Sequence, residues 1–220
     1  KAVFKSMGLP VLESTYCYRS EWKENPSAVT ARAETLGYPL YVKPANLGSS
    51  IGISRAADRA SFEQAMEVAC AYDRRILIEK GLNRPVEINC ACIGFGGKAT
   101  PSLCEQPVSW EEFLSFDQKY LRGAGKGMES LSRKIPAPIS EEQTQKIQAY
   151  TVQIFQMLEC KGVVRVDYMI DPETGTLYVC EINTIPGFTS ISMYPKLQEH
   201  MGLAYADLID KLIGFAMERY

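Results

Sequence analysis

The segment from residue 162 to residue 192 constrains the fold of this chain most, because two apolar runs in it flank a short stretch of turn-forming residues. The runs cover 163–170 and 177–182, and the residues after the first run read Asp-Pro-Glu-Thr-Gly. Asp, Pro and Gly each favour turns for a separate backbone reason. The pattern therefore predicts a β-hairpin of two antiparallel strands with its turn centred on Thr174.

Four polar side chains lie along this predicted hairpin: Arg165, Asp167, Glu181 and Asn183. If Thr174 is the centre, Asp167 faces Glu181. Arg165 then faces Asn183, two residues further from the turn. Side chains of a strand alternate between its two faces, so all four share one face. The other face takes the hydrophobic residues Val164, Val166, Tyr168 and Ile170.

The opposed carboxylates of Asp167 and Glu181 need a physical reason, because like charges that face each other destabilise a sheet. Directly opposed side chains have Cβ atoms about 4.5–5.5 Å apart. Two carboxylates and the amide oxygen of Asn183 could therefore grip one hard cation, and Mg²⁺ prefers oxygen ligands. The alternative is a solvated hairpin face that carries the charge pair by chance.

Composition is that of a folded protein and gives no sign of a nucleic-acid or membrane partner. The 220 residues are 46% hydrophobic, enough for a sizeable core in one large or two small domains. The formal net charge is −2, and the sequence has no long run of Lys and Arg. No apolar run approaches the length of a membrane span, and the first residues lack the layout of a signal peptide. These features predict a cytoplasmic protein.

The cysteines and the single histidine give no sign of a metal centre. Cys90-x-Cys92 is the only close pair among seven cysteines, so neither a disulfide framework nor a zinc ribbon is indicated. The cysteines are expected to be reduced core residues. His200, near a predicted helix end, is expected to be a surface or capping residue, which disfavours His-based zinc or proton-shuttle chemistry.

Helical and strand-like segments alternate along the chain without a fixed repeat. Helices are expected at 26–37, 58–72, 140–159 and in most of 196–219, and strands at 38–44, 75–82 and 86–94. The segment 105–134 is polar and aperiodic, which predicts a long loop. This alternation indicates an α/β or α+β class with mixed sheets.

A loop rich in small residues follows the strand expected at 38–44. Its backbone N–H groups could approach a phosphate closely at Gly48, Ser49, Ser50 and Gly52. The loop has neither the ending of a Walker loop nor a dinucleotide fingerprint, so a structural turn is the alternative. Lys43 could supply a positive charge to the same phosphates or be an ordinary solvated lysine.

The run Ile76-Leu77-Ile78-Glu79-Lys80-Gly81-Leu82 changes from aliphatic residues to charge and glycine. It is expected to be a buried strand that leaves toward a loop. The exit could offer backbone groups to a purine edge, and Glu87 downstream could accept hydrogen bonds from ribose hydroxyls. The alternative for Glu79 and Glu87 is an edge-strand or surface role, because glutamates are mostly exposed.

In this order, the motifs resemble those of the D-alanine–D-alanine ligases, which have the ATP-grasp fold. The matching residues are Lys43-Pro44, the loop Gly48–Gly52, Glu79–Leu82, Glu87, Lys119-Tyr120, Arg165-x-Asp167 and the stretch Glu181–Ser192. The resemblance covers nearly the whole chain, and ligases that make D-Ala–D-Ser or D-Ala–D-lactate share most of it. It implies a central subdomain over 1–87 and a C-terminal subdomain over 88–220, with antiparallel or mixed sheets, that hold a nucleotide between them, without the family's N-terminal domain.

The resemblance also implies how this chain binds ATP and Mg²⁺. Lys43 and Lys119 would contact phosphates, and the loop that contains Gly48, Ser49, Ser50 and Gly52 would close over them. Contacts to adenine and ribose fall to Glu79, Lys80, Leu82 and Glu87. The ligands of two magnesium ions, for which Mn²⁺ could substitute, are Asp167, Glu181 and Asn183.

A reaction mechanism follows from the same resemblance. In such ligases the carboxylate of the first D-alanine attacks the γ-phosphate of ATP to give an acyl phosphate, and the amine of a second amino acid then displaces phosphate. Arg165 and the backbone N–H of Gly187 match the groups that face the oxyanion, while Ser49 and Tyr120 share a hydrogen-bond network. The second substrate would meet Ser192 and Met193. The implied product is D-alanyl-D-alanine for peptidoglycan synthesis.

The second substrate is the least determined part of this reading. Residues 105–134 contain no histidine and include Lys119-Tyr120, which disfavours D-lactate. Phe116 stands where many D-alanine–D-alanine ligases have a tyrosine, so D-serine is kept as an alternative second substrate. Two other readings are a ligase for a different carboxylate and amine and, for the chain by itself, a nucleotide-binding module without catalysis. The implied partners are small molecules, with a homodimer as an option for the full-length enzyme.

Overall fold

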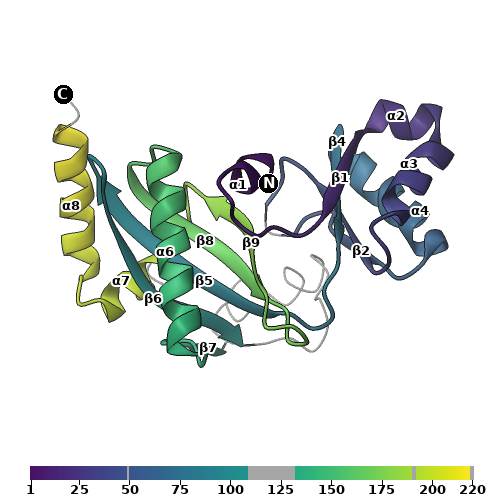
Figure 1. The fold of residues 1–220 in the computed structure, drawn as a ribbon. Helices are drawn as coiled ribbons and strands as arrows, with labels where there is room; N and C mark the ends of the chain where they lie inside the picture. Colours follow the sequence, from purple (N-terminus) through teal and green to yellow (C-terminus); the bar gives the residue numbers. More distant parts are fainter. Residues whose placement is uncertain (49, 109–131, 190–191, 219–220) are drawn as a thin grey trace. The chain divides into compact units, whose positions relative to one another are not determined.

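The computed structural model describes residues 1–48, 50–108, 132–189 and 192–218 (Figure 1). The described chain forms two compact units. The first unit is Leu12–Asn83, and the second unit holds Lys1–Val11 and the described residues from Arg84 onward. The division expected at residue 87 differs in the start of the chain, because Phe4 and Leu9 are buried in the core of the second unit.

The first unit is a four-stranded antiparallel sheet covered by helices on one face. Its strands are β1 (Ser14–Tyr18), β2 (Leu40–Pro44), β3 (Ser54–Ala56) and β4 (Arg75–Lys80), in the order β1-β4-β2-β3. Its helices are α2 (Arg19–Glu24), α3 (Pro26–Glu34) and α4 (Arg59–Tyr72). Val42, Ile76 and Ile78 pack on one face of the sheet with Trp22 and Phe62 from the helices. The opposite face is left to the alternate residues of each strand.

Local signals fix where the helices of the first unit begin. The Asn25 side chain accepts a hydrogen bond from the backbone N–H of Ala28, and Pro26 takes the first helical position of α3. Asp58 and Ser61 form a reciprocal capping box at the start of α4. These starts confirm the helices expected at 26–37 and 58–72, although α3 ends earlier, at Glu34.

The second unit is built on a five-stranded antiparallel sheet. Its strands are β5 (Val86–Phe95), β6 (Lys98–Val108), β7 (Ser132–Lys134), β8 (Gly162–Ile170) and β9 (Leu177–Asn183), in the order β7-β6-β5-β8-β9. Its helices are α1 (Ala2–Ser6), α6 (Glu141–Met157), α7 (Met193–His200) and α8 (Tyr205–Met217). Ser140 and Gln143 form a capping box at the start of α6, which confirms the helix expected at 140–159.

Two hydrophobic clusters cover opposite faces of this sheet. On one face α6 packs over β5, β6 and β8, with the buried residues Ile147, Ile154 and Phe155 (Figure 1). The expected core residues of the hairpin all lie in this cluster and are buried: Val164, Val166, Tyr168 and Ile170. On the other face, Ala91 and Ile93 of β5 pack with residues of α7 and α8. The sheet face that carries Asp167 is therefore partly covered by α7.

One expectation about the sheets is wrong in part. Residues 105–108 and 132–134 were expected in a long loop, but they lie in β6 and β7 because Gln106 pairs with Lys134 and β6 pairs with β5. The sheets were expected to be antiparallel or mixed, and every strand pairing in the described chain is antiparallel. Residues 109–131 lie outside the described part of the chain.

The cysteines are free thiols, as expected. Five of them are buried in the two units, namely Cys17, Cys70, Cys90, Cys92 and Cys104. Burial raises the pKa of Cys17 and of Cys92, each to about 12, so neither thiol is ionised near neutral pH. Across the described ranges, no helix combines the length and the apolar character needed to cross a membrane.

Candidate functional site

The β8–β9 hairpin brings together the four polar residues singled out in the sequence. Arg165 pairs with Asn183, and Asp167 pairs with Glu181, which confirms the predicted register at these positions. The pairing is not uniform, however, because Tyr168 pairs with Val179. Cys180 is left as an extra residue on β9, which defines a β-bulge.

This bulge lets β9 contribute to the core and to the polar face at once. Leu177 and Val179 are buried against α6. Glu181 and Asn183 continue the same series of every second residue along the strand. In a regular strand all four would share one face. The extra residue at Cys180 reverses the alternation, so Glu181 is exposed on the face opposite Val179.

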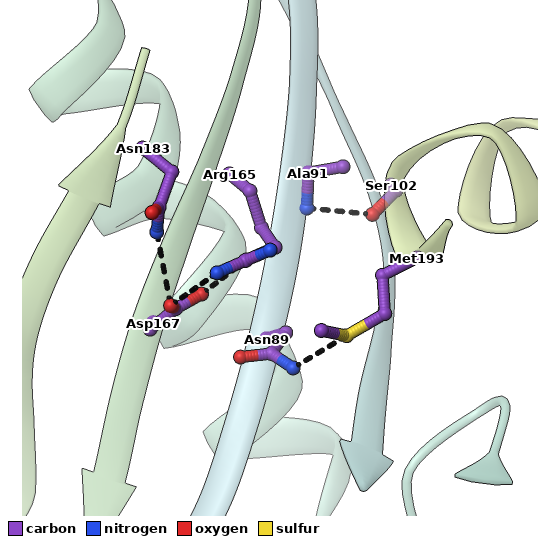
Figure 2. A network of polar contacts seen from close by, with 7 residues as sticks. All are labelled: Asn89, Ala91, Ser102, Arg165, Asp167, Asn183 and Met193. Carbon is purple, nitrogen blue, oxygen red and sulfur yellow. Dashed lines mark hydrogen bonds and ion pairs between the residues drawn. The ribbon is translucent and has the colours of Figure 1, made fainter. Parts of the chain in front are cut away.

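Asp167 is the centre of the hydrogen bonds on this face (Figure 2). Arg165 Nε donates to Asp167 Oδ1 at 2.6 Å, and Arg165 Nη2 donates to Asp167 Oδ2 at 2.7 Å. Asn183 Nδ2 donates to Asp167 Oδ2 at 2.9 Å. Charge-assisted, two-pronged pairs of this kind are stronger than neutral hydrogen bonds and fix orientation.

The guanidinium of Arg165 is held in a strongly negative environment. The exposed fractions of the Arg165 and Asp167 side chains are 16% and 20%. Burial alone would lower the pKa of Arg165, but the hydrogen bonds and charge of Asp167, together with the charges of Glu181 and Glu105, raise it. Arg165 is thus a fixed positive charge at any physiological pH.

A row of polar residues crosses four strands at this level of the sheet. Glu105 of β6 pairs with Asn89 of β5, Asn89 pairs with Asp167, and Asp167 pairs with Glu181. Glu105 is fully buried and Asn89 is 7% exposed. Sequence reasoning missed Asn89 and Glu105, because the first lies in a strand whose partner is distant in sequence and the second was expected in a loop.

The donor set on this face fits a hard divalent cation. Two carboxylates, Asp167 and Glu181, stand on paired positions, and Asn183 adds an amide oxygen next to them. Within the described ranges no group of three or more His, Cys, Asp or Glu residues could hold a metal ion, and the donor set on this face is two carboxylates and an amide. A cation at this position would offset the repulsion between the two opposed carboxylates.

The predicted substrate residues Gly187, Ser192 and Met193 contact neighbouring side chains and β5. Ser192 is 7% exposed, and its hydroxyl accepts a hydrogen bond from Thr189 N at 3.0 Å. A Cβ atom on Gly187 would lie 3.1 Å from Ser192 Oγ, so this position is tight for any larger residue. Met193 Sδ accepts a hydrogen bond from Asn89 Nδ2 at 3.1 Å (Figure 2).

In the first unit, Lys43 and Glu79 form an ion pair on the sheet face away from the helices. Lys43 Nζ lies 2.6 Å from Glu79 Oε2, with 3% of the Glu79 side chain exposed. Lys43 Nζ also lies 5.8 Å from the centre of the Tyr41 ring. The surface role weighed for Glu79 is therefore wrong, since its carboxylate is buried and paired.

The loop after β2 is shaped by residues in left-handed backbone conformations. Ser50 has φ of 61° and Gly52 has φ of 69°. A Cβ atom on Gly52 would lie 2.8 Å from Pro44 Cγ and 2.8 Å from Tyr72 Cδ2. Gly48, in contrast, has open space where a Cβ would stand. The loop is anchored at its start by Asn46 N, which donates to Asp73 Oδ2 at 2.8 Å.

The remaining predicted nucleotide residues lie at the ends of strands. Lys80 ends β4, is exposed, and donates its backbone N–H to Glu13 O at 2.9 Å. Leu82 is half-buried in the segment that follows β4. Glu87 is exposed on β5 in the second unit, where it pairs with Met169. Ser49, Phe116, Lys119 and Tyr120 lie outside the described residues.

Comparison with known families and structures identifies a broad match. The family model described as "D-ala D-ala ligase C-terminus" matches residues 3–214. A protein named D-alanine--D-alanine ligase from Chloroherpeton thalassium is 44% identical over the whole chain, which covers 58% of that protein. One of the same name from Thermoanaerobacter sp. is 40% identical, and the chain covers 59% of it. The chain thus spans rather less than two thirds of the length of these relatives.

Two solved structures of ligases are also similar to this chain over nearly its whole length. The D-alanine-D-alanine ligase from Coxiella burnetii superposes with a TM-score of 0.80 at 30% identity, covering 100% of this chain and 55% of that one. The VanG D-Ala:D-Ser ligase from Enterococcus faecalis superposes with a TM-score of 0.77 at 29% identity, covering 97% of this chain and 59% of that one. Both similarities extend over both units of the described chain.

Proposed function

Because the chain belongs to the D-alanine–D-alanine ligase family and has its ATP-grasp fold, we propose that the complete protein uses ATP to join D-alanine to a second D-alanine. The product would serve peptidoglycan precursor synthesis in the cytoplasm. The observation that carries this proposal is the hairpin face on which Arg165, Asp167, Glu181 and Asn183 meet in register. Each of these residue types suits the chemistry described next.

The reaction has two steps, and neither step requires an oxidant or a reductant. A carboxylate oxygen of the first D-alanine attacks the γ-phosphorus, the bond to the bridging oxygen breaks, and ADP leaves with an acyl phosphate formed. The amine of the second D-alanine then attacks the acyl carbon and loses a proton. The tetrahedral intermediate collapses and releases phosphate. Both steps bring anions together, so neutralisation of charge and positioning are the main catalytic tasks.

Positive charge near the reacting atoms comes from Arg165. Its guanidinium has donors beyond those directed at Asp167, and its raised pKa keeps it charged. We assign it, with the backbone N–H of Gly187, to the oxyanion of the tetrahedral intermediate. Removing one oxyanion donor from an acyl-transfer enzyme typically lowers the rate by about 10²–10³.

Asp167, Glu181 and Asn183 would hold Mg²⁺. Two such ions, or Mn²⁺ in their place, would neutralise phosphate oxygens when bound. The carboxylates of Asp167 and Glu181 supply the charge for this, while the Asn183 amide must turn its oxygen outward, away from its present donor contact with Asp167. Among the three, Glu181 is the exposed side chain, so both of its carboxylate oxygens would be available to the ions.

Most of the residues that would bind the nucleotide belong to the first unit, and Glu87 belongs to the second. Lys43 would direct its ammonium group to phosphate while its position is set by the buried Glu79. Gly48, Ser49, Ser50 and Gly52 would approach the same phosphates through backbone N–H groups, with Lys119 as a further cation. Adenine and ribose contacts are assigned to Glu79, Lys80, Leu82 and Glu87. Ser49 and Tyr120 would orient the first substrate, and Ser192 and Met193 the second.

D-Serine is the alternative second substrate. The VanG D-Ala:D-Ser ligase is among the structures that superpose well on this chain. The two acceptors differ only by a hydroxyl group, and a pocket that does not hydrogen-bond that hydroxyl discriminates weakly. A further alternative, for these 220 residues alone, is binding of ATP and Mg²⁺ without turnover.

The direct test is release of ADP and phosphate by the complete protein with ATP, Mg²⁺ and D-alanine. Turnover should require D-alanine, and mass analysis of the product with D-alanine, D-serine or D-lactate as acceptor should identify the dipeptide or depsipeptide. Equal ATP hydrolysis without any amino acid would contradict ligase function. For the 220-residue chain alone, a thermal shift with ATP and Mg²⁺ but no turnover would support the binding-only alternative.

A further inference from the structure

Asn89 connects the polar row of the sheet to the start of α7. It sits on β5 with Glu105 on one side and Asp167 on the other. It is 7% exposed, and its Nδ2 donates to the thioether of Met193, 104 residues away in sequence, at 3.1 Å. Figure 2 shows the Asn89 amide and the Met193 side chain directed at each other across the sheet surface.

The hydrogen-bond acceptor that the Asn89 amide contacts is informative about the role of this residue. A thioether is a weak acceptor, whereas the residues paired with Asn89 on either side carry carboxylates, which are strong acceptors. A buried amide without hydrogen bonds is costly, and Ala91 and Ile93 on the same face of β5 are apolar where they pack against α7. An aliphatic residue at position 89 would therefore suit the packing. We explain the amide at this position by its hydrogen bond to the Met193 side chain.

Two successive residues of α7 are attached to β5 by side-chain hydrogen bonds. Tyr194 is fully buried, and its hydroxyl donates to Cys92 O at 3.0 Å. Met193 accepts a hydrogen bond from Asn89, three residues before Cys92 on the same strand. Ser192, at the N-cap, makes no capping hydrogen bond and instead bonds Thr189. Tyr194 therefore anchors the helix, and Asn89 acts on the Met193 side chain itself.

A methionine side chain has three rotatable bonds and adapts to irregular space. A hydrogen bond to its sulfur restricts the torsions that place the terminal methyl group. We propose that Asn89 is a positioning residue for the acceptor amino acid, acting by fixing the conformation of Met193 and with it the width of the subsite for the acceptor's side chain. This inference rests on the proposed function, in which Ser192 and Met193 meet the second substrate.

The test is a double-mutant cycle in the complete protein with Asn89→Leu, Met193→Leu and both together. In the wild-type background Asn89→Leu should raise KM for the acceptor amino acid about three- to tenfold, the range of one modest hydrogen bond. KM for ATP should stay within about twofold, because the nucleotide residues are untouched. With Met193→Leu present, Asn89→Leu should add less than about twofold, since its partner atom is gone.

The preference between acceptor amino acids provides a second test of the Asn89–Met193 contact. With Met193 free to change conformation, the ratio of kcat/KM for D-alanine and D-serine as acceptors should move toward one, whichever the wild-type enzyme prefers. Met157→Leu is the matched control, because Met157 also receives an amide, from Gln153 at 3.9 Å, but lies on the exposed surface of α6. That variant should match wild type in every constant.

Several outcomes would overturn the inference. One is an Asn89→Leu effect of the same size in both backgrounds, and another is an equal rise in KM for ATP and for the acceptor. If Asn89→Leu fails to fold, Asn89→Thr removes the amide with a residue suited to strands. Methyl-labelled methionine NMR adds a test without turnover: the Met193 signal should shift in the Asn89 variant and the Met157 signal should not. A wild-type protein without acceptor-dependent turnover refutes the proposed function itself, whereas an active enzyme without the coupling refutes only this inference.

Discussion

Arg165 and Asp167, two residues apart on β8, form a two-pronged ion pair with Nε–Oδ1 and Nη2–Oδ2 distances of 2.6 Å and 2.7 Å. Both donors are directed at the carboxylate that we assign to the metal. A guanidinium and a divalent cation cannot share these oxygens fully, and they repel each other at short range. Metal binding is therefore expected to loosen this pair and to free Arg165 donors for the substrate.

Arg165→Met should consequently tighten metal binding while lowering turnover. We expect the affinity for Mn²⁺, measured by electron paramagnetic resonance with a non-hydrolysable ATP analogue, to rise by at least about threefold, because a nearby positive charge is lost. Turnover should fall by about 10²–10³. Arg165→Lys, which keeps the charge but not the planar fork, should keep the wild-type metal affinity yet not restore full turnover. Weaker Mn²⁺ binding by Arg165→Met would show that the pair supports the metal instead.

Glu181→Ala should abolish ligation without damage to the fold. The side chain is exposed on β9, so its removal is expected to change the free energy of unfolding by less than about 0.5 kcal/mol. The loss of a carboxylate that would hold the metal should lower turnover at least about 10²-fold at any Mg²⁺ concentration tested. The matched control is Glu173→Ala, at an exposed glutamate in the turn of the same hairpin. It should change neither turnover nor the free energy of unfolding. Retained activity in Glu181→Ala would remove this residue from the site.

The hairpin site was accessible to sequence reasoning because its signals are local. Turn residues, the alternation of Val164, Val166 and Tyr168, and the parity of the charged residues together place Asp167 opposite Glu181. The bulge at Cys180 was not predicted. Its signal is nevertheless in the sequence, since Val179 and Glu181 cannot be buried and exposed on one regular strand without an extra residue between them.

Other parts of the site depend on pairings that no local pattern specifies. Asn89 meets Met193 only because β5 lies beside β8 and beneath α7, and Glu105 joins the row only through β6. The polar sequence of 105–108 resembles a loop, and the ladder formed with β5 overrides that local tendency. Glu79 looks like a surface residue in sequence but is buried beside Lys43, 36 positions away.

Two glycines of the loop after β2 should respond differently to alanine. Gly52→Ala meets Pro44 and Tyr72 at 2.8 Å and keeps a left-handed backbone, so it should cost about 1–3 kcal/mol of stability in urea unfolding. Gly48→Ala has open space around its Cβ and should leave stability within about 0.5 kcal/mol. If that space admits phosphate, the Gly48 variant should raise KM for ATP while KM for D-alanine is retained. Equal stability losses in the two variants would contradict the steric account.

The Lys43–Glu79 pair allows a structural role to be separated from nucleotide binding. Lys43→Met removes the ammonium group that lies 2.6 Å from a nearly buried carboxylate, and we expect a loss of about 1–3 kcal/mol in unfolding free energy together with weak ATP binding. Adding Glu79→Gln removes that charge and should recover most of the stability, because a neutral amide is cheaper to bury than a carboxylate. It should not recover ATP binding, measured by calorimetry, if the ammonium group contacts phosphate. Recovery of both properties in the double variant would mean that Lys43 serves only to neutralise Glu79.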